Sequence, residues 1–328
     1  MKQDADDMTL KPFDFSQILE EVPEIGKFAV KIDSFSFEPP IDSSDVEPSL
    51  WQKLACLIKD KYDDYDGFII LHGTDTMAYS ASALSFMLDG LTKPVIFTGS
   101  QLPIGVPRTD GRENLISAVE IASAKDENGN PAVPEVCVCF ASLLMRGNRS
   151  TKVNSEGFRA FQSPNFPPLA EAGINIRYNN EYIRKPNDWL QNLSINTNLD
   201  TRVSILKIHP GITPQVVRNI LCGEETRAVI METYGSGNAP SSKWFLDILE
   251  EAKAMDKIVV NVTQCLAGTV NMNLYATGKH LEESGVIDGN DLTTESALAK
   301  LFYLMGKSQD NAWVRAMMGR NLKGEISK

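Results

Sequence analysis

The sequence predicts an α/β protein with a large N-terminal domain, built on a doubly wound and mostly parallel sheet, and a smaller C-terminal α/β domain. Three observations lead to this prediction. Short apolar stretches alternate with segments whose apolar residues recur at helical spacing, as in parallel sheets covered by helices. The same pattern restarts after a polar, turn-rich stretch. The chain of 328 residues is long for one core and sufficient for two.

The first domain is expected to span residues 1–184. Its strands are predicted where β-branched and aromatic residues form apolar runs, at residues 28–32, 67–71, 94–97 and 135–140. Helices are predicted between them at residues 49–58, 76–89 and 110–124. Gly90 ends the second helix, and a polar turn over residues 126–130 follows the third.

Residues 185–201 are expected to form a linker, because they are polar and rich in turn-forming Asn and Asp. The second domain is then predicted over residues 202–328. Its strands are expected at residues 202–208, 228–231 and 258–262. One helix is expected to begin at Thr213, and a second helix is expected to include residues 244–246.

Charge and cysteine content narrow the class of function. The formal net charge is −11 with no block of Lys or Arg, which favours a small-molecule ligand over nucleic acid or an anionic membrane. The five cysteines are scattered without zinc-ligand spacing, as expected for reduced thiols. The acidic N-terminus has no apolar targeting segment, and no run reaches membrane-spanning length. A cytoplasmic protein is therefore expected.

Polar residues follow several predicted strands where ligands bind in open parallel sheets. They are Ile41-Asp42-Ser43-Ser44-Asp45, His72-Gly73-Thr74-Asp75-Thr76, Thr98-Gly99-Ser100-Gln101 and Arg146-Gly147-Asn148-Arg149-Ser150-Thr151-Lys152. We expect them to converge on one rim of the sheet. His72, at the end of an apolar strand, is expected to be a buried and hydrogen-bonded imidazole rather than a base or metal ligand.

This rim suits a small zwitterionic substrate. Asp75 can hold an ammonium, while hydroxyls and helix-terminal N–H groups can hold a carboxylate. Lys152, near Asp75, can help to remove the proton of Thr74, because a hydroxyl nucleophile needs an adjacent base. Each residue also has a purely structural interpretation: threonine, serine and aspartate are common helix caps, and a lysine is usually a solvated surface charge.

Other motifs are rejected. The stretch Tyr234-Gly235-Ser236-Gly237-Asn238-Ala239-Pro240 has a proline at the third glycine position of a dinucleotide fingerprint. The sequence has neither a Walker A motif nor a Gly-x-Ser-x-Gly elbow.

The loops at residues 72–77, 98–101 and 146–152, with residues 234–240 and Thr263-Gln264-Cys265, together resemble the cytosolic, type I bacterial L-asparaginases. The resemblance runs over almost the whole chain. It implies hydrolysis of L-asparagine to L-aspartate and ammonia by a threonine nucleophile, without metal or cofactor. It also implies a large and a small α/β domain, and a homodimer that often pairs into a homotetramer.

Carried over residue by residue, the resemblance implies a catalytic triad of Thr74, Asp75 and Lys152. Asp75 would also bind the substrate ammonium, and Thr76 is expected to cap the following helix. The remaining substrate-binding residues implied are Ser43 and Ser44 for the carboxylate, Ser100, and Asn238, which would reach the active site of a neighbouring subunit.

The sequence departs from this family in two places. Family members begin with an apolar strand and a Thr-Gly-Gly-Thr-Ile-Gly-Met motif that carries the primary nucleophile, whereas this sequence starts at what resembles the final methionine of the motif. A chain truncated at its first strand is expected to have little activity, and the natural protein to be longer and active. Glu232 replaces an arginine that some type I enzymes use to bind asparagine as an activator, so we expect hyperbolic kinetics.

Two other functions stay open. A non-catalytic protein would bind asparagine or aspartate without releasing ammonia. The amidase subunit of a tRNA-dependent amidotransferase would need an RNA-binding partner, which the charge of −11 argues against.

Overall fold

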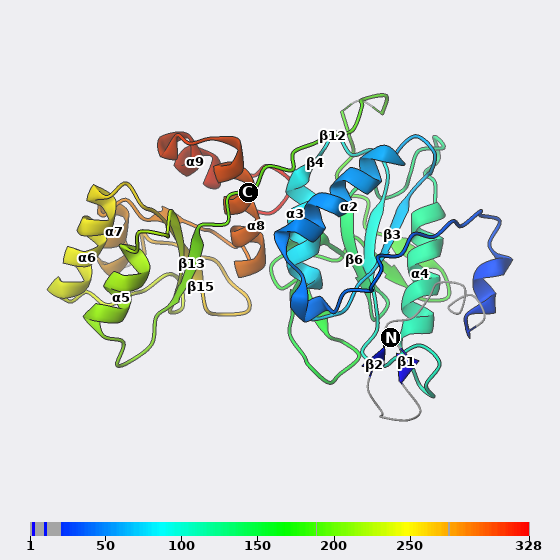
Figure 1. Ribbon diagram of the computed structural model, residues 1–328, viewed down its shortest axis with the longest axis horizontal. Coiled ribbons are helices and arrows are strands. Elements are labelled where there is room, and N and C mark those ends of the chain that lie inside the picture. The colour runs from blue at the N-terminus through cyan, green and yellow to red at the C-terminus, as the bar shows by residue number, and fades with distance from the viewer. Residues whose placement is uncertain (1, 4–9, 12–20, 188, 275, 328) are drawn as a thin grey trace. The chain divides into compact units, whose positions relative to one another are not determined.

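The computed structural model describes residues 2–3, 10–11, 21–187, 189–274 and 276–327 and divides into two compact units. The first comprises Met1–Ser163 and Pro167–Thr197, and the second comprises Pro164–Phe166 and Asn198–Lys328. Both units contain parallel strands covered by helices, which confirms the predicted fold class (Figure 1). Among the helices of the described ranges, none is both long and apolar enough to cross a membrane.

The main sheet of the first unit has six strands. In their order across the sheet they are β11 (Ile176–Tyr178), β10 (Ala170–Ala172), β7 (Leu143–Arg146), β6 (Val136–Phe140), β5 (Val95–Thr98) and β3 (Phe68–Leu71). The strands β3, β5 and β6 are parallel, and each of the other three is antiparallel to its neighbours. The sequence suggested that Lys152 follows directly from the carboxyl end of β6. Instead, β7 returns beside β6, and the chain reaches Lys152 only after this hairpin.

The parallel strands owe their burial to helices on both faces. Figure 1 shows α2 (Pro48–Asp60) and α3 (Met77–Met87) on one face and α4 (Gly111–Ser123) on the other. Every residue of β5 and β6 is therefore buried, as their continuous apolar sequences predict. In contrast, β3 lies at the edge of the sheet, and its last residue, Leu71, is 42% exposed.

The helix α3 is packed closely because its buried face consists largely of alanine and serine. The short helix η3 (Gly147–Arg149) lies against it, and a Cβ atom on Gly147 would come within 3.1 Å of the Cβ of Ala81 and 3.0 Å of the Val136 carbonyl oxygen. A side chain at this position would be tightly crowded, so glycine suits the close approach. After η3 the chain forms β8 (Thr151–Lys152), which pairs with β9 (Phe161–Gln162).

The strand predicted at residues 28–32 is wrong. After the short helix η1 (Pro23–Lys27), this segment forms neither helix nor strand. A strand is stable only where its backbone groups pair with a neighbour. Here Phe28 and Ile32 instead pack their side chains against a cluster formed by Val22, Ile25, Leu115 and Val119.

The helix predicted at residues 76–89 is shorter than expected. It ends at Met87, and Leu88–Asp89 forms β4, which pairs with β12 (Ser194–Ile195). Thus part of the segment expected to be a linker belongs to a small sheet of the first unit. Among the described residues, the other elements of this unit are the two-stranded sheet of β1 (Lys2–Gln3) with β2 (Leu10–Lys11), and the short helix η2 (Ser43–Asp45).

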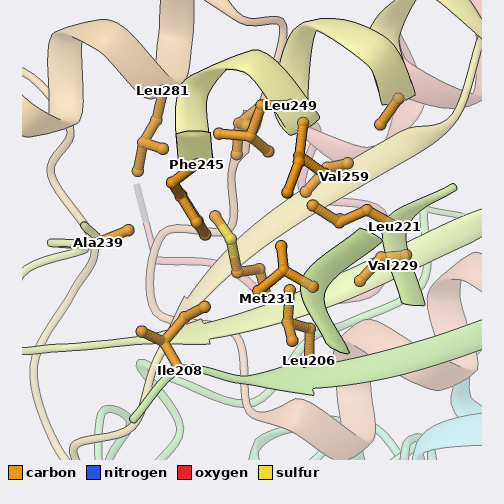
Figure 2. Packing of buried hydrophobic residues seen from close by; sticks show 14 of the residues in the cluster. Leu206, Ile208, Leu221, Val229, Met231, Ala239, Phe245, Leu249, Val259 and Leu281 are labelled. Atoms are coloured by element: carbon orange, nitrogen blue, oxygen red, sulfur yellow. The ribbon is translucent and has the colours of Figure 1, made fainter. Parts of the chain in front are cut away.

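The second unit contains a fully parallel sheet of four strands. Its elements in chain order are β13 (Val203–Lys207), α5 (Pro214–Leu221), β14 (Ala228–Thr233), α6 (Lys243–Ala254), β15 (Ile258–Thr263), α7 (Ala276–Glu283), β16 (Ile287–Asp288), α8 (Thr294–Lys307) and α9 (Asn311–Met318). Figure 2 shows Phe245 and Leu249 of α6 packed over Val229 and Met231 of β14. Because side chains alternate along a strand, these two residues of β14 share one face of the sheet.

Candidate active site

The site is built where β3 and β5 end. Leu71 pairs with Thr98, so the two strands finish at the same level, and the N–H group of His72 donates to the Thr98 carbonyl at 2.9 Å. A Cβ atom on Gly99 would lie 2.3 Å from the His72 carbonyl oxygen. The glycine therefore allows the loop after β5 to touch the loop after β3, which carries Thr74 and Asp75.

Lys152, from β8, reaches Thr74 and Asp75 in this loop. The Lys152 Nζ donates to Thr74 Oγ1 at 2.8 Å and to Asp75 Oδ1 at 2.6 Å. The Lys152 side chain is 20% exposed, whereas that of Asp75 is 62% exposed. An ion pair of this exposure adds little to stability. Its consequence is geometric, because it places the amine against a hydroxyl.

Gln101 is a fourth member of this group; it belongs to a polar stretch expected at the rim, but it was not singled out as a site residue. Thr74 Oγ1 donates to Gln101 Oε1 at 3.1 Å, and Gln101 Nε2 donates to the Gly157 carbonyl at 3.3 Å. The available signal was its place in the loop after β5, beside Ser100. That signal was too weak to select it, because its partner Thr74 is 27 residues away in the sequence.

The loop of Ser100 and Gln101 is held by the start of α4. Both carboxylate oxygens of Asp110 accept the N–H group of Gln101 at 3.0 Å, and Oδ1 also accepts that of Leu102 at 3.1 Å. Asn114 is buried and donates to the Gly99 carbonyl at 2.9 Å. Ser100 itself lies beside the first turn of α4, since a Cβ atom on Gly111 would be 3.3 Å from its Oγ.

Ser43 is brought to the site by two contacts with the loop after β3. It is buried, and its side chain lies against Gly73, where a Cβ atom would come within 2.6 Å of the Ser43 Cβ. Thr76 Oγ1 donates to the Ser43 carbonyl at 2.6 Å. The expected capping role of Thr76 is wrong: it stands at the N-cap position of α3, but its side chain makes no capping hydrogen bond.

Ser44 is turned toward Asp42. Its N–H group and its hydroxyl donate to Asp42 Oδ1 at 2.9 and 2.8 Å. The N–H bond, and then the hydroxyl bond, lower the pKa of Asp42. An ionised Asp42 therefore stabilises the turn that presents Ser43.

His72 is held below the reactive loop by a chain of hydrogen bonds. Trp51 Nε1 donates to Ser80 Oγ at 2.9 Å, and Ser80 Oγ lies 2.9 Å from His72 Nε2. His72 Nδ1 lies 2.7 Å from the Gly73 carbonyl oxygen, which only accepts, so this nitrogen carries the hydrogen. Burial lowers the pKa of His72, although the bond to Gly73 raises it. His72 is thus a neutral structural imidazole.

Asn238 lies in the second unit, in a turn whose ends pair: the N–H group of Tyr234 donates to the Asn238 carbonyl at 2.9 Å. Gly237 closes the turn with φ of +105°. Asn238 thus belongs to a different unit from the group around Thr74. Within the described parts of the chain, no group of three or more His, Cys, Asp or Glu side chains could hold a metal ion.

The arrangement can activate a hydroxyl beside a carboxylate. The structure brings together Thr74, Asp75, Lys152 and Ser43, all expected from the sequence, and adds Gln101. The expected origin of two of them was wrong, because Ser43 does not follow a strand and Lys152 follows β7 and η3. Contacts across the fold, rather than strand ends alone, bring these two residues to the rim.

Comparisons with known proteins agree on one family. The family model described as "Asparaginase, N-terminal" matches residues 1–184, and the model described as "Glutaminase/Asparaginase C-terminal domain" matches residues 202–318. L-asparaginase 1 of Escherichia coli (strain K12) is 47% identical over 305 residues, which are 93% of this chain and 86% of that protein.

A solved structure and a more distant relative complete the comparison. The crystal structure of L-asparaginase I from Vibrio cholerae O1 biovar eltor superimposes with a TM-score of 0.86 at 42% identity, over 96% of this chain and 92% of that one. One subunit of the glutamyl-tRNA(Gln) amidotransferase of Sulfurisphaera tokodaii is 35% identical over 327 residues, 95% of this chain and 69% of that protein.

Proposed function

Because the chain belongs to the asparaginase family, we propose that it hydrolyses L-asparagine to L-aspartate and ammonia. The observation that carries the proposal is the position of the Lys152 amine, 2.8 Å from the Thr74 hydroxyl oxygen and 2.6 Å from Asp75. A hydroxyl becomes a nucleophile when a base lies within hydrogen-bond reach, and the base needs a third group to orient it. Thr74, Lys152 and Asp75 fill these three roles.

The same geometry supports a way to bind the substrate. Asp75 uses Oδ1 for Lys152, and its exposed carboxylate has a second oxygen for the substrate ammonium. Ser43, against the backbone of the reactive loop, is proposed to bind the substrate carboxylate. Ser44 was expected to share this role. Since both of its donors bind Asp42, we propose that it shapes the turn that positions Ser43.

The reaction follows from these roles. Neutral Lys152 takes the proton of Thr74, whose oxygen attacks the side-chain amide carbon of asparagine. The C–N bond breaks, and the leaving nitrogen takes the proton from the Lys152 ammonium and departs as ammonia. Water then loses a proton to Lys152 and attacks the resulting ester, which releases aspartate and returns the proton to Thr74. We assign the attack to Thr74 because its hydroxyl is the one that lies against the Lys152 amine.

The assembly is proposed to be a cytoplasmic homodimer or homotetramer, in which Asn238 contacts substrate in the neighbouring subunit. Mixing two inactive variants tests this. When Asn238→Ala and Thr74→Val chains are refolded together, half of the sites in a mixed dimer have both native residues. Recovered ammonia release supports the shared site, and no recovery in verified mixed dimers contradicts it. Ser100, beside α4, is proposed as a further substrate contact of the same subunit.

The products distinguish the proposed function from its alternatives. Ammonia and aspartate are measured after incubation with L-asparagine and, separately, with L-glutamine. Ammonia and aspartate in equal amounts from asparagine support the proposal. Binding of asparagine by calorimetry without ammonia release would instead favour a non-catalytic binding protein. Ammonia release only when a tRNA-binding partner is added would favour the amidase subunit of an amidotransferase.

A further inference from the structure

The side chain of Gln101 is held between two groups that determine its orientation. The Gly157 carbonyl has no hydrogen to give, so the amide nitrogen of Gln101 must face it, at 3.3 Å. The amide oxygen then faces Thr74 Oγ1, at 3.1 Å. An amide oxygen accepts only, so the Thr74 hydroxyl must donate its single hydrogen to Gln101.

This orientation determines what Thr74 presents to Lys152. With its hydrogen directed to Gln101, the hydroxyl turns its lone pairs to Lys152 Nζ, 2.8 Å away. The lysine must then donate, as the ammonium form does. For Lys152 to take the Thr74 proton, the amine has to be neutral and the hydroxyl has to turn away from Gln101. The amide of Gln101 therefore favours the protonated form of Lys152.

The backbone of Gln101 is fixed independently of Thr74. Asp110 accepts the N–H groups of Gln101 and Leu102 with its carboxylate, although it stands at the N-cap of α4 and makes no side-chain cap within that helix. Asn114 donates to Asp110 Oδ2 at 3.3 Å and accepts the N–H group of Ala141 at 3.0 Å. Bonds to a carboxylate are stronger than neutral ones, so Asp110 holds firmly the backbone from which the Gln101 side chain reaches Thr74.

We propose that Gln101, anchored by Asp110, is a positioning residue that directs the Thr74 hydroxyl and thereby sets the pH at which Lys152 becomes neutral. This inference rests on the proposed function of Thr74 and Lys152. It assigns a regulatory role over proton transfer to a side chain that does not need to touch the substrate.

Two substitutions at this position have opposite expected effects. Gln101→Met keeps the length of the side chain but removes the acceptor, so the Thr74 hydroxyl is free to donate to neutral Lys152. Lys152 should then lose its proton at a lower pH than in the native chain. Gln101→Glu offers Thr74 a charged acceptor and adds a negative charge near Lys152, so the proton should be lost at a higher pH.

The deciding experiment follows the ε-carbon signal of Lys152 by NMR against pH, in protein with ¹³C-labelled lysine. The signal is identified by its absence from Lys152→Gln. The matched control is Gln52→Met, which removes a glutamine that donates to the Thr197 carbonyl at 2.8 Å, away from Thr74. The titration midpoint is expected at the lowest pH in Gln101→Met, at a higher and equal pH in the native chain and the control, and at the highest pH in Gln101→Glu. Midpoints that are equal, or in any other order, would overturn the proposal.

This measurement separates the inference from the proposed function. It needs no turnover, so the order of midpoints can hold even if no ammonia is released, in which case only the hydrolase proposal fails. Where ammonia is released, the acidic limb of the kcat/KM profile should move in the same order. Ammonia release with unmoved midpoints would leave the hydrolase proposal in place and remove the role of Gln101.

Discussion

Thr76 and Ser43 are joined by a hydrogen bond of 2.6 Å, from the threonine hydroxyl to the serine carbonyl, that ties the loop before α2 to the loop after β3. These residues are 33 positions apart in the sequence. The bond explains why Thr76 does not cap α3: its hydroxyl is used to hold a residue of the proposed substrate site. The N-terminus of α3 is thus less completely capped, and the position of Ser43 is better defined.

Thr76→Val should therefore weaken substrate binding more than it slows the chemical step. A neutral hydrogen bond contributes about 1 kcal/mol, so KM for asparagine should rise by roughly fivefold with kcat nearly unchanged. Steady-state kinetics with Thr76→Ser as the control checks this, because serine keeps the hydroxyl. An equal rise in KM for the valine and serine variants would show that the bond to Ser43 is not the cause.

Lys152→Gln should abolish proton transfer while leaving the fold intact. General base catalysis contributes about 100-fold to 10,000-fold, so ammonia release should fall at least about 100-fold. The free energy of unfolding should change by less than about 1 kcal/mol, because the partner carboxylate of Asp75 is largely exposed. Lys53→Gln, on the exposed surface of α2, is the matched control. Residual activity close to native in Lys152→Gln would exclude lysine as the base.

His72 should make the folded protein less stable in mild acid. Burial lowers its pKa below the ordinary 6.5, so as the pH falls through 6.5 the unfolded chain binds a proton that the folded chain does not. The unfolded state is then favoured, and this loss of stability ends below the folded pKa, where both states are protonated. Unfolding free energies measured from about pH 7 to pH 5 should fall less steeply for His72→Asn than for the native chain.

The control for this prediction is His209→Asn, since His209 is exposed in the second unit. Its variant should keep the native slope of unfolding free energy against pH. If His72→Asn and the native chain have the same slope, protonation of His72 does not contribute to acid sensitivity.

Glu232 should keep the kinetics hyperbolic. Its carboxylate accepts a hydrogen bond from Thr294 at 2.7 Å and lies 3.4 Å from the Lys207 ammonium. An anion that is already engaged by these partners should repel a ligand carboxylate rather than bind it. Rates measured over a wide range of asparagine concentration should fit a Hill coefficient of about 1, in the native chain and in Glu232→Ala. A sigmoidal curve that Glu232→Ala abolishes would contradict this.

The sequence predicted those elements of the fold that a local pattern of apolar residues identifies. The apolar runs that became β3, β5 and β6 and the periodic segments that became α2, α3 and α4 were all recognisable. The segment at residues 28–32 was misassigned because its composition is that of a strand, whereas strand formation depends on a partner. The strand β7 was missed because it is defined by its pairing with β6, and this pairing is not visible in the composition of residues 143–146.

The same division applies to the site. Thr74 and Asp75 could be predicted because they lie in the loop after the apolar strand β3. Lys152 was predicted as the base that a hydroxyl nucleophile needs, and the resemblance of its motif agreed. The contact of Gln101 with Thr74, and the support of its loop by Asp110, depend on distances between separate loops. Polar side chains such as these have several possible partners, and only the folded chain selects among them.

The central claim is that the Thr74 hydroxyl, activated by Lys152, attacks the amide of asparagine. The most direct test measures ammonia release from L-asparagine by the native chain and by Thr74→Val, with Thr201→Val as the control at an exposed threonine. The account predicts slow but measurable release by the native chain and the control, and release at the level of the enzyme-free reaction for Thr74→Val. Equal release by the native chain and Thr74→Val would contradict it.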